Sequence, residues 1–329
     1  MLVLLYILVS FTAFLLIIGL FISFRFTTDG TLKGRFRSIF TSFGVFIPGA
    51  IDISTLYKLW GLHILSTETR FINLGYWKNA DCMDDAGRDL AHLLGEHAEI
   101  SSGDDLLDVG FGYGDQDLYW MKTFRPRSIT GLNIIKSQVD AARELVRKND
   151  LEDKIDLRHG SATEIPFESN SFDKIVALEC AFHFNSRDDF FKQAFHVLRD
   201  GGRLALADIV PASTNDGCPK PGILARILEP FRVAAWKIPR CNQRIGVAEY
   251  RKQLEGIGFI NVNVTSISDH VFAPLRKKVL NTMKYPEVYK RLHPLHRTRL
   301  SIAIYAAYIS HGPPFAPMNY ILISADKAG

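Results

Sequence analysis

Apolar and polar positions follow two repeating patterns along most of the chain. Short apolar runs, typical of strands buried on both faces of a sheet, alternate with longer stretches in which apolar residues recur every three to four positions, as in amphipathic helices. Strands are predicted at residues 105–109, 128–133, 154–158, 172–178, 203–209, 260–264 and 319–324, and helices at 137–148, 188–198 and 248–257. Because strands alternate with helices, the pattern predicts an α/β fold with a parallel sheet and crossover helices.

The amino-terminal pattern is different, because residues 1–24 contain no charged side chain. At about 1.5 Å per residue, a helix of this length crosses a hydrocarbon core of roughly 30 Å. A cleaved signal peptide is the alternative, but it requires a basic start and small residues at the cleavage point. The apolar run begins at residue 2 and ends in FISFRF. We therefore expect a retained transmembrane anchor at residues 1–24.

Basic residues directly follow this segment: Arg25, Lys33, Arg35 and Arg37 stand against Asp29 alone. By the positive-inside rule they favour a cytoplasmic position for the rest of the chain. The sequence thus predicts a single-pass membrane protein with a cytoplasmic catalytic domain, in the endoplasmic reticulum if the source is eukaryotic.

Residues 25–66 continue as a basic and then apolar stretch interrupted by glycine and proline. Its apolar pieces are too short to span a membrane, which predicts an interfacial linker. The catalytic domain is expected at residues 67–329. Two insertions in it, residues 211–246 and 265–318, are predicted to form lids at the mouth of the site. The basic runs 276–278 and 290–299 in the second insertion are either a solvated face or a contact to an anionic membrane.

Composition limits the function classes. A hydrophobic content of 47% with 22% charged residues is typical of a folded globular protein. The formal net charge of +4 is compatible with a membrane surface and too small to indicate nucleic-acid binding. The four cysteines include no close pair, so neither a zinc site nor a disulfide framework is expected.

A glycine turn follows the first predicted strand, where the chain reads D-x-G-x-G-x-G from Asp108 to Gly114. Glycine permits a close approach of the backbone to a ligand and a positive φ. A dinucleotide-binding turn reads G-x-G-x-x-G and holds a pyrophosphate at a helix N-terminus. Here Asp108 and Asp115 bracket the turn with carboxylates, which would repel a pyrophosphate and suit an ammonium or a sulfonium. The turn therefore predicts a cationic nucleoside ligand.

Four segments in order resemble the successive motifs of class I S-adenosylmethionine-dependent methyltransferases. They are LLDVGFGYGD (106–115), SITGLNI (128–134), SATEIPFESNSFDKIVALE (161–179) and VLRDGGRLALADI (197–209). The resemblance implies a Rossmann-like sheet of seven strands, the last antiparallel, with helices on both faces. Further segments resemble the small-molecule and lipid branch, which includes cyclopropane-fatty-acid synthases and sterol and tocopherol methyltransferases. They are FINLGYW (71–77), GLNIIKSQ (131–138), ECAFHF (179–184) and AAWKIP (234–239) with Asn242.

The same resemblance implies S-adenosylmethionine as the cofactor and assigns the residues that bind it. They are Tyr76, Trp77, Asp108, Gly110, Gly112, Asn133, Gln138, Ser161 and Ala162. Asp108 and the two glycines are expected around the methionine end and the ribose. Tyr76 and Trp77 are expected to close over the methionine, because an aromatic face favours a sulfonium.

The chain departs from the family pattern at two cofactor positions. Asn133 stands where most members have an acid for the ribose hydroxyls, and Gln138 is expected to assist it. Ser161 stands where an aspartate commonly accepts the adenine amino group, and Ala162 offers only its backbone N–H. Both departures are expected to lower cofactor affinity without abolishing the site.

Catalysis is predicted at Glu179 and His183, which follow the strand 172–178. Methyl transfer is an in-line displacement that requires alignment and, for some acceptors, removal of one proton. His183 is either a general base, since histidine has an unperturbed pKa of about 6.5, or a packing residue. Glu179 either takes a proton, stabilises a carbocation, or orients the loop or the cofactor.

The sequence thus predicts a membrane-anchored methyltransferase acting at a membrane surface on a hydrophobic small molecule or lipid, with no nucleic-acid partner and no metal. Two alternatives remain at this point. One is a catalytically silent cofactor-binding or scaffold protein on a membrane. The other is a nucleotide-dependent oxidoreductase of similar topology.

Overall fold

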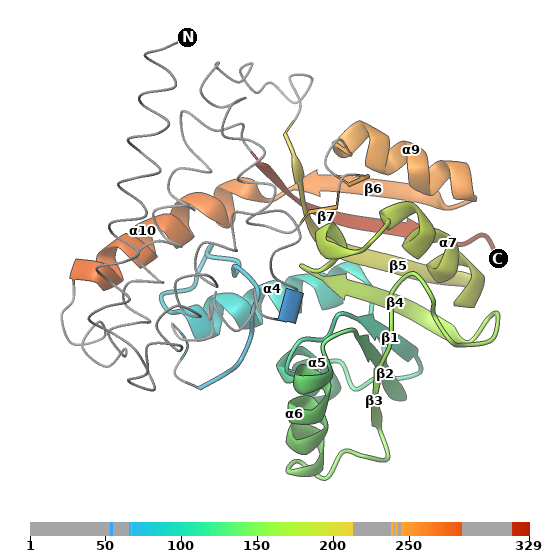
Figure 1. Cartoon of the computed structure of the whole chain (residues 1–329), viewed down its shortest axis with the longest axis horizontal. Helices are drawn as coiled ribbons and strands as arrows, with labels where there is room; N and C mark the ends of the chain where they lie inside the picture. Colours follow the sequence, from blue (N-terminus) through green and yellow to red (C-terminus); the bar gives the residue numbers. More distant parts are fainter. Residues whose placement is uncertain are drawn as a thin grey trace, which may run out of the picture.

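The computed structural model describes residues 53–54, 66, 68–212, 238–239, 241–242, 245–284 and 318–329. Within them seven strands form one sheet in the order β3-β2-β1-β4-β5-β7-β6 (Figure 1). The strands are β1 (Asp105–Val109), β2 (Ser128–Asn133), β3 (Ile155–His159), β4 (Phe172–Leu178), β5 (Leu198–Pro211), β6 (Ile260–Ser266) and β7 (Met318–Asp326). The helices are α4 (Met83–His97), α5 (Asp115–Thr123), α6 (Lys136–Arg147), α7 (Arg187–Val197), α9 (Val247–Ile257) and α10 (Phe272–Lys284), with short 3₁₀ helices η2 (Ala181–His183) and η4 (Ser268–His270).

Strand directions confirm the predicted α/β sheet. Neighbouring strands from β3 to β5 pair in parallel, whereas β7 pairs antiparallel with both β5 and β6. The last strand is therefore the antiparallel one, as the resemblance implied. Strand β5 extends beyond the predicted residues 203–209 at both ends, since Leu198 pairs with Phe172 of β4 and β7 pairs with β5 as far as Pro211.

Successive residues of the central strands enter two separate cores, which is the period-two pattern of a sheet buried on both faces. In β4, Val176 and Leu178 belong to one core, and Ile175 and Ala177 to the other. Helices α4, α5 and α6 contribute to the first core, and helices α7 and α9 to the second. Helices thus cover both faces of the sheet, as predicted.

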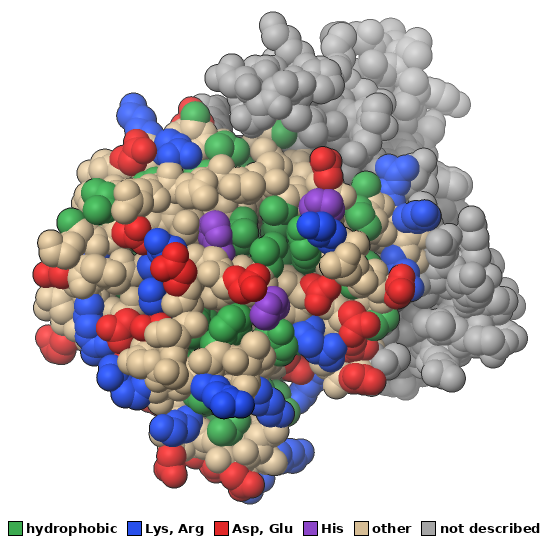
Figure 2. Space-filling model, turned by 180° about the vertical axis from the view of Figure 1, so that it is seen from behind, with side chains coloured by type: hydrophobic (Ala, Val, Ile, Leu, Met, Phe, Trp, Pro, Cys, Tyr) green, Lys and Arg blue, Asp and Glu red, His purple; other side chains and the backbone are tan. Residues whose placement is uncertain are grey.

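Charged side chains of both signs are intermixed over the described surface in the face that Figure 2 shows. At the strand ends opposite the glycine turn they form ion pairs, such as Arg199–Asp173 at 2.6 Å and Arg203–Asp326 at 2.7 Å. Pairs of this kind, partly open to water, contribute little to stability individually.

The predicted localisation, a single-pass membrane protein, is corrected by the structure. The longest described helix is α4 with 15 residues, which is about 22 Å long and shorter than a hydrocarbon core of roughly 30 Å. None of the described helices has the length and apolarity to cross a membrane.

Several sequence predictions fall outside the described residues. They concern the anchor at 1–24, most of the linker at 25–66, most of the insertion 211–246, and residues 285–317 of the second insertion. That the two insertions act as lids stays a prediction.

Candidate functional site

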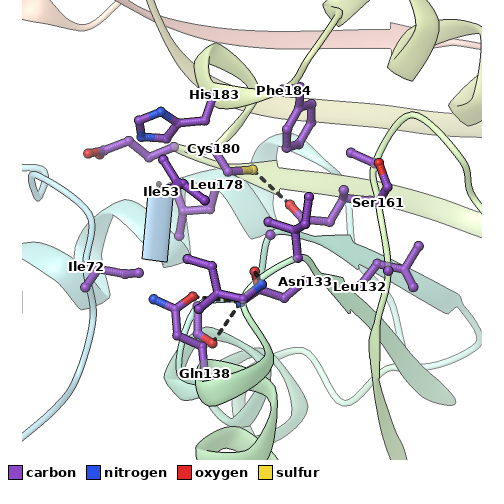
Figure 3. A pocket seen from close by; sticks show the side chains of 18 of the residues that line it. Ile53, Ile72, Leu132, Asn133, Gln138, Ser161, Leu178, Cys180, His183 and Phe184 are labelled. Atoms are coloured by element: carbon purple, nitrogen blue, oxygen red, sulfur yellow. Dashed lines mark hydrogen bonds between the residues drawn. The ribbon is translucent and has the colours of Figure 1, made fainter. Parts of the chain in front are cut away.

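A cavity of about 260 Å³ lies at the carboxyl ends of the parallel strands (Figure 3). Its wall is formed by the glycine turn after β1 and by the residues that follow β2, β3 and β4. Ile72 and Asn73, from the segment before α4, complete it on one side. This edge of an open α/β sheet is where such folds bind ligands.

The glycine turn has the backbone that its sequence predicts. The φ angles of Gly110, Gly112 and Gly114 are 87°, 60° and 85°, in the left-handed region that favours glycine. A Cβ atom at Gly110 would lie 2.6 Å from the Sγ of Cys180, and one at Gly112 would lie 3.0 Å from the Cδ1 of Ile72. Gly110 is therefore required by the packing of the loop after β4, in addition to any approach of a ligand.

Two amides line the cavity where β2 ends. The Asn133 Nδ2 donates to the Gly112 carbonyl at 3.2 Å and to the Gln138 Oε1 at 2.9 Å. The Gln138 Nε2 is buried and has no hydrogen-bond partner in the described part of the chain. A buried amide donor without a partner is costly, so this group is available to an oxygen of a ligand such as a ribose hydroxyl.

Ser161 and Ala162 lie on the cavity wall in the loop after β3. The Ser161 Oγ is hydrogen-bonded to the Thr163 Oγ1 at 3.0 Å and accepts from the Thr163 N–H at 3.3 Å. The loop is thus fixed by its own side chains at the position where the sequence predicts the adenine end of a nucleoside.

Glu179 immediately follows β4 and lines the cavity. Its Oε2 accepts hydrogen bonds from the Leu74 N–H at 2.8 Å and from the Tyr320 hydroxyl at 2.6 Å. Burial raises the pKa of this carboxyl to about 8. Glu179 therefore joins the loop after β4 to strand β7 and to the segment before α4.

His183 ends the 3₁₀ helix η2 and also lines the cavity. Its backbone N–H donates to the Cys180 carbonyl at 2.9 Å, and its ring centroid lies 4.0 Å from that of Phe182. In Figure 3 the imidazole lies across the cavity from Gln138. An imidazole at this position can exchange a proton with a molecule in the cavity.

Three predicted cofactor residues do not lie on the cavity wall. Asp108 is fully buried and accepts from the Gln116 Nε2 at 2.6 Å. The Trp77 side chain is buried, and its Nε1 donates to the Leu74 carbonyl at 2.8 Å. Tyr76 makes an edge-on contact with the ring of His270, at 5.3 Å between centroids.

The sequence reasoning missed four residues that line the cavity, namely Ile72, Asn73, Gln116 and Cys180. The only signal for them was their presence in or beside the quoted motifs. Asn73 is 3% exposed; its amide donates to the Gly87 carbonyl at 3.2 Å and accepts from the Gly75 N–H at 3.0 Å. Among the described residues no group of His, Cys, Asp and Glu side chains could hold a metal ion.

Comparison with known proteins is consistent with this geometry. A family model described as a methyltransferase domain matches residues 107–206. Erythromycin 3''-O-methyltransferase of Saccharopolyspora erythraea is 35% identical over 274 residues, which are 81% of this chain and 87% of that enzyme. The 27-O-demethylrifamycin SV methyltransferase of Amycolatopsis mediterranei is 33% identical over 47% of this chain and 54% of its own length.

Solved structures share the fold. A putative sarcosine dimethylglycine methyltransferase from Galdieria sulphuraria matches 84% of this chain and 99% of its own, with a TM-score of 0.62 and 20% identity. Geranyl diphosphate C-methyltransferase from Streptomyces coelicolor matches 75% of this chain and 82% of its own, with a TM-score of 0.55 and 16% identity.

Proposed function

The chain belongs to the class I S-adenosylmethionine-dependent methyltransferases that act on small molecules, and on this premise we propose that it methylates a hydroxyl oxygen of a hydrophobic acceptor. The observation that carries the proposal is the 35% identity to an erythromycin 3''-O-methyltransferase across 87% of that enzyme. The presence of His183 on the cavity wall supports it, because a hydroxyl must lose its proton as it attacks.

The cavity residues fit the cofactor. We place its ribose against Asn133 and Gln138, because the unpartnered Gln138 Nε2 offers a donor there. The methionine end is placed at Gly110 and Gly112, and the adenine beside Ser161 and Ala162. Closure by Tyr76 and Trp77 stays a prediction.

Two side chains of the cavity wall have separate roles in the proposed methyl transfer. S-Adenosylmethionine, when bound, supplies a methyl carbon activated by a positively charged sulfur. His183 accepts the proton of the acceptor hydroxyl. Glu179 is mostly uncharged at neutral pH, because its pKa is raised to about 8, and its hydrogen bonds to Leu74 and Tyr320 suit a residue that positions the cavity wall.

The acceptor atom is tested with S-adenosylmethionine that carries a deuterated methyl group. The purified protein is incubated with macrolides that bear free ring and sugar hydroxyls, and with matched compounds in which those hydroxyls are already methylated. We expect the label on oxygen in the first set and no product from the second. Label on carbon or nitrogen contradicts the proposal. Cofactor binding without product from any acceptor favours the catalytically silent alternative.

The role of His183 is tested by His183→Asn, which keeps a polar side chain of similar shape and removes the base. We expect turnover to fall by roughly 10²–10⁴-fold, the range of general base catalysis, with unchanged affinity for S-adenosylmethionine. His196→Asn on the exposed side of α7 is the matched control and should keep full turnover. A parallel loss of cofactor affinity in His183→Asn would make His183 a positioning residue.

A further inference from the structure

The end of the first insertion meets the loop of His183 at the cavity wall. Four residues from these two parts of the chain line the cavity: His183, Phe184, Asn185 and Pro239. The Asn242 backbone N–H donates to the Pro239 carbonyl at 2.9 Å. The Asn242 Nδ2 donates to the Phe184 carbonyl at 2.7 Å, across 58 positions of the chain. Asn242 thus connects the two parts of the wall.

The amide of Asn242 is fully buried, with 0% of the residue exposed. Its Oδ1 accepts from the Arg187 backbone N–H at 3.2 Å. Its backbone carbonyl accepts from the Arg187 Nη1, also at 3.2 Å. The neighbouring Cys241 thiol donates to the Asn185 carbonyl at 2.8 Å. Two consecutive residues therefore hold the chain from Phe184 to Arg187.

His183 depends on such outside contacts for its position. It belongs to η2, a 3₁₀ helix of three residues, and so short a helix has few hydrogen bonds of its own. On one side of His183, the Phe182 backbone N–H donates to the Asp208 Oδ1 at 3.0 Å. On the other side, the Phe184 carbonyl accepts from Asn242. The backbone is thus held by buried side chains both before and after His183.

These contacts bear on the base and not on the cofactor. In Figure 3, His183 and Phe184 lie across the cavity from Gln138, where the ribose is placed. A base must lie within hydrogen-bond reach of the hydroxyl proton, and a misplacement of about 1 Å can lower a rate by about 10²-fold. We propose that Asn242 is a positioning residue of the methyl transfer, which holds His183 within reach of the acceptor hydroxyl. This proposal rests on the proposed role of His183 as the base.

The first test is Asn242→Ala, which removes both side-chain hydrogen bonds and adds no charge. We expect kcat to fall by roughly ten- to hundredfold, with the Kd of S-adenosylmethionine within about twofold of the wild type. Calorimetry gives this Kd, and its stoichiometry gives the folded fraction of the protein. Asn149→Ala is the matched control, because the Asn149 Nδ2 also donates to a backbone carbonyl, that of Leu145 at 2.9 Å, but away from the cavity wall. It should keep full turnover.

Asn242→Asp carries the test if Asn242→Ala does not fold. It keeps the shape of the side chain and the acceptor for the Arg187 N–H, and an ionised carboxylate has no donor for the Phe184 carbonyl. The same separation of kcat from cofactor affinity is expected. A kcat within about twofold of the wild type in a folded variant overturns the proposal. So does a parallel loss of kcat and cofactor affinity, which would mean that Asn242 stabilises the fold as a whole.

NMR of the free enzyme reports on His183 and needs no acceptor. The protein has ten histidines, and the imidazole signal that disappears in His183→Asn belongs to His183. We expect this signal to shift in the Asn242 variants and to stay in place in Asn149→Ala. An unchanged signal in the Asn242 variants overturns the proposal. A shifted signal, together with a wild-type enzyme that methylates no hydroxyl, would refute the proposed function and support the link between Asn242 and His183.

Discussion

Glu179 lies on the cavity wall with a φ of 53°, a left-handed conformation that costs a non-glycine residue about 1–2 kcal/mol. The hydrogen bonds from Leu74 and Tyr320 hold it there. The Tyr320 hydroxyl is itself buried, and burial together with Glu179 raises its pKa well above the usual value. Two other parts of the chain, the segment before α4 and strand β7, therefore constrain the Glu179 side chain, as expected for a positioning residue.

The raised pKa of Glu179 predicts a pH-dependent stability. The carboxyl has an ordinary pKa of 4.5, which burial raises to about 8 in the native state, so the folded protein binds more protons than the unfolded chain between these values. The contribution of the protonated form is complete below 4.5 and is lost as the pH rises to about 8. The free energy of unfolding should fall by up to about 1.4 kcal/mol per pH unit in this interval.

Urea denaturation across this interval checks the prediction, and Glu179→Gln should remove the slope that Glu179 contributes. Tyr320→Phe is the companion variant. Because the Tyr320 hydrogen bond lowers the pKa of Glu179, its loss should extend the slope to higher pH. An identical pH dependence in wild type and Glu179→Gln would contradict the assignment.

At the scale of elements, one buried ion pair fixes the loop that carries His183. Arg187, the first residue of α7, donates from Nε to the Asp208 Oδ2 in β5 at 2.8 Å, and both side chains are fully buried. Asp208 also accepts from the Phe182 backbone N–H at 3.0 Å and from the Tyr250 hydroxyl at 3.1 Å. This carboxylate thus joins β5, α7, α9 and η2 beside the cavity.

Asp208→Asn should therefore be strongly destabilising, by about 3–5 kcal/mol, because it leaves the Arg187 guanidinium buried without a countercharge. Tyr250→Phe removes only one hydrogen bond to the same carboxylate and should cost about 1.5–3 kcal/mol. Urea denaturation of both variants gives the comparison. A cost for Asp208→Asn no larger than that for Tyr250→Phe would show that the ion pair contributes no more than a hydrogen bond.

At the scale of the whole molecule, the sequence predicted the strands whose bounds depend on neighbouring residues, and did not predict features that depend on contacts between distant parts of the chain. The bounds of β1, β2 and β4 agree with the sequence prediction, and each is a short segment whose apolar residues, such as Leu106, Ile129 and Ile175, are buried in the sheet. The length of β5 depends on antiparallel pairing with β7, which no local pattern contains. Likewise, Tyr320 reaches Glu179 across 141 positions of the chain.

Among the predicted cofactor residues, Gly110, Gly112, Asn133 and Gln138 do line the cavity, and their motifs are contiguous in the sequence. Their roles in binding stay predictions. Asp117 has the spacing of an ordinary first-turn acid, and only the tertiary structure buries it completely. Trp77 lies in a buried cluster with Met83 and Ala86, and its closure over the methionine stays a prediction.

The most direct test of the central claim, that the cavity at the carboxyl edge of the sheet binds S-adenosylmethionine, is a calorimetric titration with that ligand and with NAD. We expect S-adenosylmethionine to bind and NAD not to bind. Gln138→Glu keeps the acceptor for Asn133 and replaces the unpartnered donor, so it should weaken binding about tenfold, as for one lost hydrogen bond. Gln253→Glu on α9, away from the cavity wall, should bind as the wild type does. Binding of NAD alone, or unchanged affinity in Gln138→Glu, would contradict the account.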